Sequence, residues 1–483
     1  MQIKDRLGII LINLSVRKLG IVKDINLDIK PLTIFIGENN TNKSWVAYSL
    51  YGILHKENRR ELTKEYLNLK DTIFIYKNEL KEFINDIVDK LTRFYSVEIK
   101  DCGEFIDKYL NQLLNDLAKN FSRDFIYSFF GINRETKLFS KTEIDVYITE
   151  EFKEKIKEDF INSSLDAKVK AKDYEFIKVY KGKNEKNIII EISLLEDIPV
   201  KYIKRAISDI ILDILVNSIF KGIYLFPSER KALATFSERL QKSLISKVSD
   251  KNNIPYELLF QFYLKEEFEF PILLEDFIKF VSDLKKNRLS KYTQIKKFIE
   301  TIIGGKVVFD EMSEYITFVP YKTNNELPVY STSSMVKSLS TFYLYLEKIA
   351  SGKDFIILDE PEMNLHPKAQ AEFLELLSIF INGIEKDDRN FLIATTHTPY
   401  ILEHLENLIL GYCKRKELAN LTFLKTENAF ISPENISIYQ FLNNGTVKNL
   451  LDRENKYIDW SSFSKVSSKL SEIGFNIEEK ISS

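Results

Sequence analysis

Two short, uninterrupted apolar runs set among helical segments constrain the fold of this chain more than any other feature. The runs are FIILD at 355–359 and FLIATT at 391–396, and each is followed by a segment whose apolar residues recur at helical spacing. A strand that is apolar throughout is buried on both faces, as in parallel sheets that helices cover on both sides. The alternation over residues 333–412 therefore predicts an α/β fold built on a parallel sheet.

Periodicity divides the rest of the chain into further segments. Strands are expected over 7–16, 21–29 and 32–36, and from about 54 to 172 long charged and aliphatic stretches have helical apolar spacing. Next we expect a hairpin of 174–180 with 188–194, a helix over 200–220, a strand over 222–226, further helices, and strands after Gly304 and Gly305. The predicted units are 1–55, a mainly helical insertion at 56–222, a region of helices and a small β group at 223–332, 333–412, and a C-terminal extension at 413–483.

The charge balance argues against a dedicated nucleic-acid-binding protein. The 69 basic and 71 acidic residues nearly cancel, and the pI of about 6.3 is far from the basic value typical of dedicated nucleic-acid binders. Any nucleic-acid surface must therefore be a local patch. The best candidate is the run Lys285–Lys297, which we interpret as a solvated helix face.

The cysteines and the apolar stretches indicate a cytoplasmic protein. Cys102 and Cys413 are too few for a disulfide framework and have no metal-ligand spacing. No charge-free apolar stretch approaches the roughly 18 to 20 residues that a membrane helix needs, so no membrane partner is expected. The opening residues have no cleavage site and lead directly into strands, so we predict structure there and not a signal.

The segment IFIGENNTNKSW, residues 34–45, is typical of a phosphate-binding loop. A buried strand leads into Gly37, a polar turn follows, and Lys43 and Ser44 open a helix. Backbone N–H groups and the positive end of the helix can face phosphates, while Lys43 adds a charge and Ser44 can ligate magnesium. The predicted binding residues are Gly37, Asn39, Asn40, Thr41, Asn42, Lys43 and Ser44.

Asn42 departs from the usual pattern, because that position of the loop normally holds glycine. The position is expected to need a left-handed backbone, which asparagine tolerates best after glycine. We therefore expect binding to survive the change, with a weakened affinity and an uncertain rate of hydrolysis.

The apolar strand FIILD ends in two adjacent carboxylates, Asp359 and Glu360, which Pro361 follows. In a fold with a phosphate-binding loop, the first would hold magnesium and the second would act as general base toward a water molecule. A simple helix cap before Pro361 is the alternative. The strand, both acids, the proline and the histidine of NLHP occur together, which favours the catalytic interpretation.

Histidine and serine residues complete the set of candidates. The strand FLIATT is followed by His397, which we predict near the γ-phosphate, and His366 is expected near the same edge of the sheet. His55 and His404 are expected at ordinary surface positions. Ser333 and Ser334 open a helix ahead of the acid pair, where hydroxyl groups form either an anion site or a plain helix cap.

Four segments resemble, in chain order, the phosphate loop, signature, acid pair and histidine switch of SMC-like and RecF-like ABC ATPases. They are LTIFIGENNTNKS, TSSMVKSLS, IILDEPEMNLHPKAQ and IATTHTPYIL. More narrowly, the chain is similar to stand-alone prokaryotic AAA-family, OLD-like ATPases, and it carries a similar YLFPSER segment at 224–230. The resemblance covers about 1–55 and 223–412. It implies an ABC-type P-loop NTPase head, with a mixed sheet and flanking helices, split by the helical insertion.

The resemblance also implies an activity and partners. ATP and Mg²⁺ would be sandwiched between two chains of a homodimer or higher homo-oligomer, with Ser333 and Ser334 acting in trans on the nucleotide of the partner chain. The expected function is an ATP-hydrolysing switch for a nucleic acid or a separate nuclease or effector protein, with a role in defence against phage or mobile DNA suggested by family analogy alone. A RecF-type DNA repair clamp and a nucleotide-bound scaffold with negligible hydrolysis remain the alternatives.

Three departures limit the resemblance. The signature has no Gly-Gly, which argues against a membrane transporter, and no long heptad coiled coil is present to act as a DNA-tethering arm. Because 86 residues of the sequence follow His397, we expect no complete toprim nuclease domain there. That segment is expected to contain strands, an Asn-Gly hairpin turn at Asn444 and Gly445, and a terminal helix.

Overall fold

A six-stranded sheet forms the centre of the computed structural model, which describes residues 11–68, 79–171, 174–193, 200–232, 271–284, 290–309, 316–323, 325–384, 389–459, 461, 468–469 and 471–477. The strand order is β16-β15-β3-β14-β13-β9. Five strands run parallel and β16 is antiparallel to β15, so the sheet is mixed, as predicted. The bounds are β3 Leu32–Gly37, β9 Gly222–Phe226, β13 Asp354–Asp359, β14 Phe391–Thr396, β15 Ile436–Phe441 and β16 Val447–Asn449.

Helices cover both faces of this sheet, which explains why its central strands are apolar throughout. Every residue of β3, β13, β14 and β15 is buried. Alternate residues point to opposite faces: Phe35 and Ile357 pack with α1 (Lys43–Leu54), whereas Ile34 and Leu358 pack on the other side. The helices on that second side are α12 Ser334–Lys348, α13 Pro367–Asn382 and α14 Pro399–Leu410.

A second, three-stranded sheet packs against α1 and joins the same core. It consists of β1 Ile12–Leu19, β2 Val22–Ile29 and β5 Glu143–Ile148, all antiparallel. The strand β5 comes from the middle of the segment predicted as a helical insertion, so the chain returns to the first sheet at this point. Polar residues alternate with apolar ones in β5. This pattern is short and stands between two helical segments, so it was not recognised as a strand.

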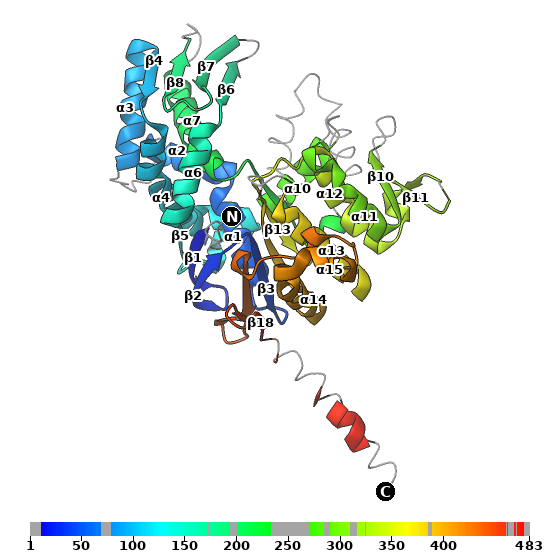
Figure 1. Ribbon diagram of the computed structural model, residues 1–483. Helices are drawn as coiled ribbons and strands as arrows, with labels where there is room; N and C mark the ends of the chain where they lie inside the picture. Colours follow the sequence, from blue (N-terminus) through cyan, green and yellow to red (C-terminus); the bar gives the residue numbers. More distant parts are fainter. Residues whose placement is uncertain are drawn as a thin grey trace, which may run out of the picture.

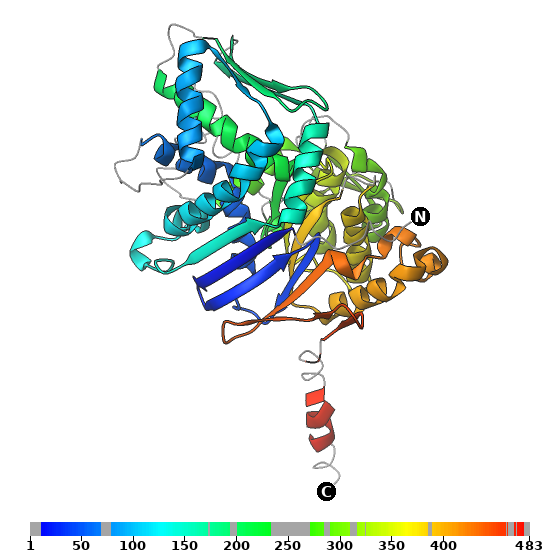
Figure 2. The same ribbon diagram turned by 60° about the vertical axis from the view of Figure 1, so that its left-hand side comes forward.

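The segment around β5 is helical, as predicted, but it also contains a four-stranded antiparallel sheet of order β4-β8-β7-β6. Figures 1 and 2 show α3 and these strands projecting away from the central sheet. The predicted hairpin is present as β7 and β8, and the predicted helix as α7. The bounds are α2 Lys56–Tyr66, α3 Glu79–Phe94, β4 Ser96–Ile99, α4 Cys102–Asn120, a π-helical turn Phe121–Phe125, α5 Ile126–Phe130, α6 Glu150–Asn162, β6 Leu165–Ala171, β7 Tyr174–Lys181, β8 Ile188–Ile192 and α7 Val200–Ile219.

The region before α12 holds the predicted helices and small β group, on the opposite side of the molecule from α3 in Figure 1. Residues 285–289 of the lysine-rich run lie outside the described residues, and Lys296 pairs with Glu347 at 2.5 Å, so this end of the run is not a purely solvated face. The bounds here are α10 Ile272–Asp283, α11 Lys296–Ile303, β10 Gly305–Phe309, β11 Ile316–Pro320 and β12 Leu327–Pro328.

The C-terminal extension adds β15 and β16 to the central sheet, joined by the predicted turn at Asn444 and Gly445. It also contains α15 Arg415–Leu418, β17 Leu451–Asp452 and β18 Tyr457–Ile458. Residues 471–477 are helical and lie apart from the rest of the molecule in Figure 1. Short 3₁₀ turns occur at Arg134–Thr136, Lys291–Gln294, Val329–Ser331, Gly411–Lys414, Ala419–Leu421, Glu427–Ala429 and Pro433–Asn435.

The predicted surface positions of His55 and His404 are wrong. His55 Nε2 lies 2.6 Å from Asp276, and only 10% of its side chain is exposed. His404 Nε2 lies 2.9 Å from the fully buried Glu375. A lone histidine gives no sequence signal for such a partner, because Asp276 and Glu375 are far from it in the chain.

Among the helices in the described ranges, none has the length and apolar character needed to cross a bilayer.

Candidate functional site

The loop between β3 and α1 contains three residues with positive φ. Gly37 has a φ of 154°, and Asn40 and Asn42 have φ values of 64° and 62°. Asn42 is left-handed, as predicted for the position that usually holds glycine. Its side chain also has a function that glycine could not supply, because Asn42 Oδ1 accepts a hydrogen bond of 3.0 Å from the backbone N–H of Ile21. Asn42 thus ties the loop to the β1–β2 turn.

Lys43 lies inside the loop and holds it together. Its Nζ donates to the carbonyl oxygens of Gly37 at 3.1 Å and Glu38 at 2.8 Å, and to Thr41 Oγ1 at 3.3 Å. Burial lowers the pKa of Lys43 to about 8, although the nearby carboxylates of Glu360 and Asp359 oppose this shift. The loop therefore holds a cation whose charge is disfavoured by burial and would be stabilised by an anion.

The parallel register brings the loop and the acid pair together. Ser44 Oγ donates a hydrogen bond of 2.8 Å to Asp359 Oδ1, although 315 residues separate the two in the chain. Tyr48, one helical turn after Ser44, donates to Asp359 Oδ2 at 2.7 Å, and Thr395 Oγ1 donates to Asp359 Oδ1. Three hydroxyl groups from α1 and β14 thus fix the carboxylate of Asp359, which is buried.

Glu360 has an unusual backbone and lies beside His397. Its φ is 45°, a left-handed value that a residue with a side chain rarely adopts, and its N–H donates to Thr395 Oγ1 at 3.1 Å. His397 Nε2 lies 3.2 Å from Glu360 Oε1, and both side chains are about one-third exposed. The hydrogen bond from His397 lowers the pKa of Glu360, against the opposing effect of burial. Glu360 is therefore an ionised carboxylate at neutral pH with access to solvent.

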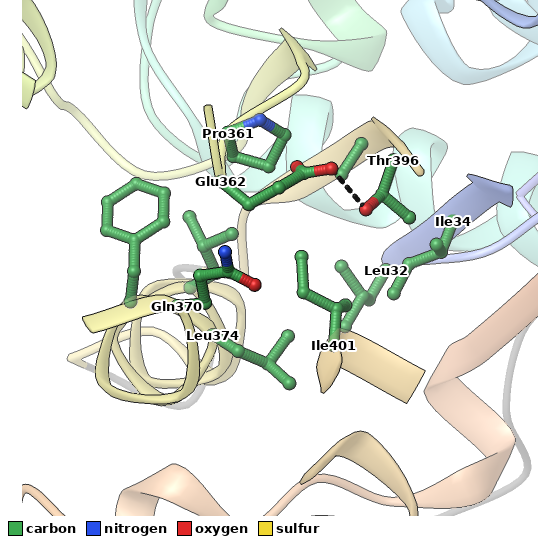
Figure 3. Close-up of a pocket in the computed structure, with 11 residues that line it drawn as sticks. Leu32, Ile34, Pro361, Glu362, Gln370, Leu374, Thr396 and Ile401 are labelled. Carbon is green, nitrogen blue, oxygen red and sulfur yellow. Dashed lines mark hydrogen bonds between the residues drawn. The ribbon is translucent and has the colours of Figure 1, made fainter. Parts of the chain in front are cut away.

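The carboxyl group of Glu362 holds the backbone at His397 in place. Its Oε1 accepts hydrogen bonds from Thr396 Oγ1 at 2.6 Å and from the backbone N–H of His397 at 3.0 Å. Figure 3 shows this carboxyl at the edge of a small apolar cavity between α13 and the sheet. Burial raises the pKa of Glu362, and its second oxygen, Oε2, has no hydrogen-bond partner within the described structure.

Arg230, the last residue of YLFPSER, lies fully buried beneath the acid pair. Its Nη1 donates to the carbonyl oxygen of Asp359 at 2.6 Å and its Nη2 to that of Glu360 at 2.9 Å. The same guanidinium contacts Ser338 of α12. Its neighbour Lys231 donates to Ser334 Oγ at 3.0 Å.

The structure does not place every predicted residue in one cluster. Ser333 caps α12 by accepting from the N–H of Val336 at 3.4 Å. Among the described residues, the hydrogen bonds of the two signature serines are to α12 and to Lys231. The serines thus make no hydrogen bond to the loop or acid pair of their own chain in the part that the structure describes. His366 caps α13 by accepting from the N–H of Lys368 at 3.3 Å.

Sequence reasoning missed three contributors: Tyr48, Arg230 and Glu362. Tyr48 stands four residues after Ser44 on the same helical face, which is a signal that could have been used. Arg230 belongs to a segment that was recognised without a role. Glu362 follows the acid pair by two residues, but the sequence gives no sign that its side chain turns inward.

The chain belongs to the AAA ATPase domain family, whose model matches residues 10–402. The prediction of an AAA-family ATPase is therefore confirmed at the level of the family. A search of curated proteins found no match.

Solved structures that match include SMC heads and RecF, all at low similarity. The SMC head bound to the C-winged helix domain of ScpA is 11% identical, with a TM-score of 0.33, over 90% of this chain and 95% of that chain. The SMC head domain from Thermotoga maritima is 11% identical, with a TM-score of 0.28, over 91% and 97%. The recombination mediator protein RecF-ATPrS is 10% identical, with a TM-score of 0.30, over 92% and 100%. We draw no inference about this site from likeness at that level.

Substitution of Asn42 tests the left-handed loop position. Asn42→Ala should lower the free energy of unfolding by about 2 kcal/mol, because alanine is disfavoured at this φ and cannot accept from Ile21. Asn42→Gly loses only the hydrogen bond, so we expect a smaller loss of about 1 kcal/mol. Denaturant titration of the three proteins decides the order. Equal stability of the Ala variant and the wild type would contradict this account.

Substitution of Glu362 tests its support of His397. Glu362→Ala leaves the Thr396 hydroxyl and the His397 N–H without their acceptor, so we expect a loss of about 2 kcal/mol in stability and faster hydrogen exchange at the His397 amide. Glu362→Gln keeps a carbonyl oxygen at that position and should lose less than about 1 kcal/mol. If the His397 amide exchanges hydrogen at the wild-type rate in both variants, Glu362 does not hold this amide.

Proposed function

We propose that this chain binds and hydrolyses ATP with Mg²⁺ at the edge where β3, β13 and β14 end. The observation that carries the proposal is the 2.8 Å hydrogen bond between Ser44 Oγ and Asp359 Oδ1. It joins a loop suited to phosphates to an acid pair suited to a metal and a water molecule. Membership of the AAA ATPase domain family supports the same activity.

The side chains at this edge fit Mg²⁺. Ser44 and Asp359 offer a hydroxyl and a carboxylate oxygen, which are the hard ligands that Mg²⁺ prefers. No group of three or more His, Cys, Asp or Glu suited to a metal occurs in the described ranges, and Mg²⁺ bound with a nucleotide needs none, since phosphates and water fill its other positions. When bound, the ion would neutralise charge on the phosphates.

The residues of the chain have distinct proposed roles. The backbone of the loop and the start of α1 would bind the phosphates, and Lys43 would turn from the loop carbonyls toward the β- and γ-phosphates. Glu360, an ionised carboxylate, would accept the proton of the attacking water as general base. His397, held by Glu362 and adjacent to Glu360, would lie beside the γ-phosphate and orient that carboxylate.

Self-association is part of the proposal. Ser333 and Ser334 lie at the N-terminus of α12, where hydroxyl and backbone N–H groups can bind an anion. In the part of the chain that the structure describes, their hydrogen bonds are to α12 and Lys231, and their proposed role is to act on the nucleotide of a second chain. Closure on ATP and opening after hydrolysis would make the dimer a switch for a nucleic acid or a nuclease or effector protein, with a defence role resting on family analogy alone.

The pKa of Lys43 predicts how ATP affinity depends on pH. Below pH 8 Lys43 is already charged, but above its pKa of about 8 ATP binding must also protonate it, because phosphates favour the charged form. The affinity should therefore fall by up to about tenfold per pH unit above 8. Titrations between pH 7 and 9.5 measure this. Lys43→Arg, which stays charged, should give a flat profile whatever its affinity, and a flat wild-type profile would contradict the assignment.

Glu360→Gln tests both hydrolysis and assembly. The amide cannot accept the proton of water, so phosphate release should fall about 100-fold or more while ATP still binds. Size measurement by light scattering should then detect an ATP- and Mg²⁺-dependent dimer that the variant accumulates and the wild type loses as ATP is consumed. Hydrolysis at the wild-type rate would remove Glu360 from the mechanism, and a monomer in every condition would refute the trans role of Ser333 and Ser334.

A further inference from the structure

Arg230 is bound through every one of its N–H groups. Besides the carbonyl oxygens of Asp359 and Glu360, it donates from Nη1 to Pro227 O at 3.1 Å, from Nη2 to Ser338 Oγ at 3.0 Å and from Nε to Ser338 O at 3.2 Å. A guanidinium has five N–H donors, so none is left over. Burial lowers the pKa of Arg230, while the carboxylate of Asp359 counters this. Such a group fixes the relative positions of everything it contacts.

One end of this network is the strained backbone of Glu360. The left-handed φ of 45° is unfavourable for glutamate and persists only if its surroundings hold it. Two side chains do so: Thr395 accepts from the N–H of Glu360, and Arg230 donates to its carbonyl oxygen. The same carbonyl oxygen also accepts from the backbone N–H of Met363 at 3.1 Å, so loss of the Arg230 contact would remove one of its two hydrogen bonds and loosen the peptide that directs the carboxylate.

The other end of the network is α12. Ser338 and Ser334 are four residues apart, on one face of the helix, and they are contacted by the adjacent residues Arg230 and Lys231. Residues 230 and 231 therefore connect the start of α12, where Ser333 and Ser334 lie, to the backbone of the acid pair. A shift of α12 along its axis must be met by a shift of Arg230 or by the loss of its hydrogen bonds.

We propose that Arg230 is a positioning residue that transmits the position of α12 to Glu360. Docking of Ser333 and Ser334 on the nucleotide of a second chain would thereby set the direction of Glu360 in their own chain, so that the two sites hydrolyse ATP cooperatively. The inference rests on the proposed ATPase function and deepens it: the signature of one site regulates the general base of the other. A purely structural role, in which a buried arginine only stabilises the fold, predicts no such link.

Ser338→Ala gives the sharpest test, because it removes one acceptor of Arg230 and leaves the nucleotide-binding residues intact. We expect ATP affinity within twofold of wild type, a single-turnover hydrolysis rate about tenfold lower, and a Hill coefficient for ATP that falls toward 1. The matched control is Ser340→Ala. Ser340 is equally buried in α12 but donates to Lys337 O, so its loss should leave rate and Hill coefficient unchanged.

Arg230→Lys provides a second variant and a check on the pathway. Lysine keeps the charge but cannot bind both carbonyl oxygens and Ser338, so the rate should fall as in Ser338→Ala, and combining the two should add no further loss. Additive losses, or variants that lower the melting temperature while rate and cooperativity stay at wild-type values, would overturn the proposal. If Arg230→Lys does not fold, Ser338→Ala against Ser340→Ala still decides. Absence of ATP turnover in the wild type would instead refute the proposed function itself.

Discussion

The parallel register of β3, β14 and β13 is the constraint on which the site depends. Ile36 lies opposite Thr396, and Thr395 lies opposite Asp359, so strands far apart in the chain end at one edge of the sheet. Because side chains at that edge are brought within hydrogen-bond reach, Ser44 can contact the carboxylate of Asp359. The helices on both faces help to fix this register, since a slip of one strand by one residue would turn its side chains to the opposite faces, against helices that are packed around other side chains.

Hydroxyl groups and one guanidinium, more than ion pairs, organise the acid pair. Ser44, Tyr48 and Thr395 hold Asp359, whereas the backbone of Glu360 is held in a strained form by Thr395 and Arg230. Strain of this kind is found where a function requires a particular direction of a side chain. Rigidity near Asp359 and strain at Glu360 suit the two different roles proposed for the neighbouring carboxylates, one a ligand and the other a base.

The sequence predicted the parts of the molecule that local patterns control. Apolar runs located the strands of the central sheet, and the left-handed preference of asparagine predicted Asn42. The pairing of β5 with β1 could not be predicted from the sequence, because pairing between distant strands produces no local sequence pattern. For the same reason the partners of His55 and His404 were missed, and Arg230 and Glu362, whose contacts depend on tertiary packing, were not assigned a role.

The convergence of Ser44 and Asp359 on one Mg²⁺ ion can be measured directly by a double-mutant cycle. The quantity is the gain in ATP affinity that Mg²⁺ produces in wild type, Ser44→Ala, Asp359→Asn and the double variant. If both side chains hold the same ion, each single change removes most of that gain and the double variant loses little more. Independent, additive losses, or an unaltered magnesium effect in the single variants, would contradict the shared site and with it the ATPase account.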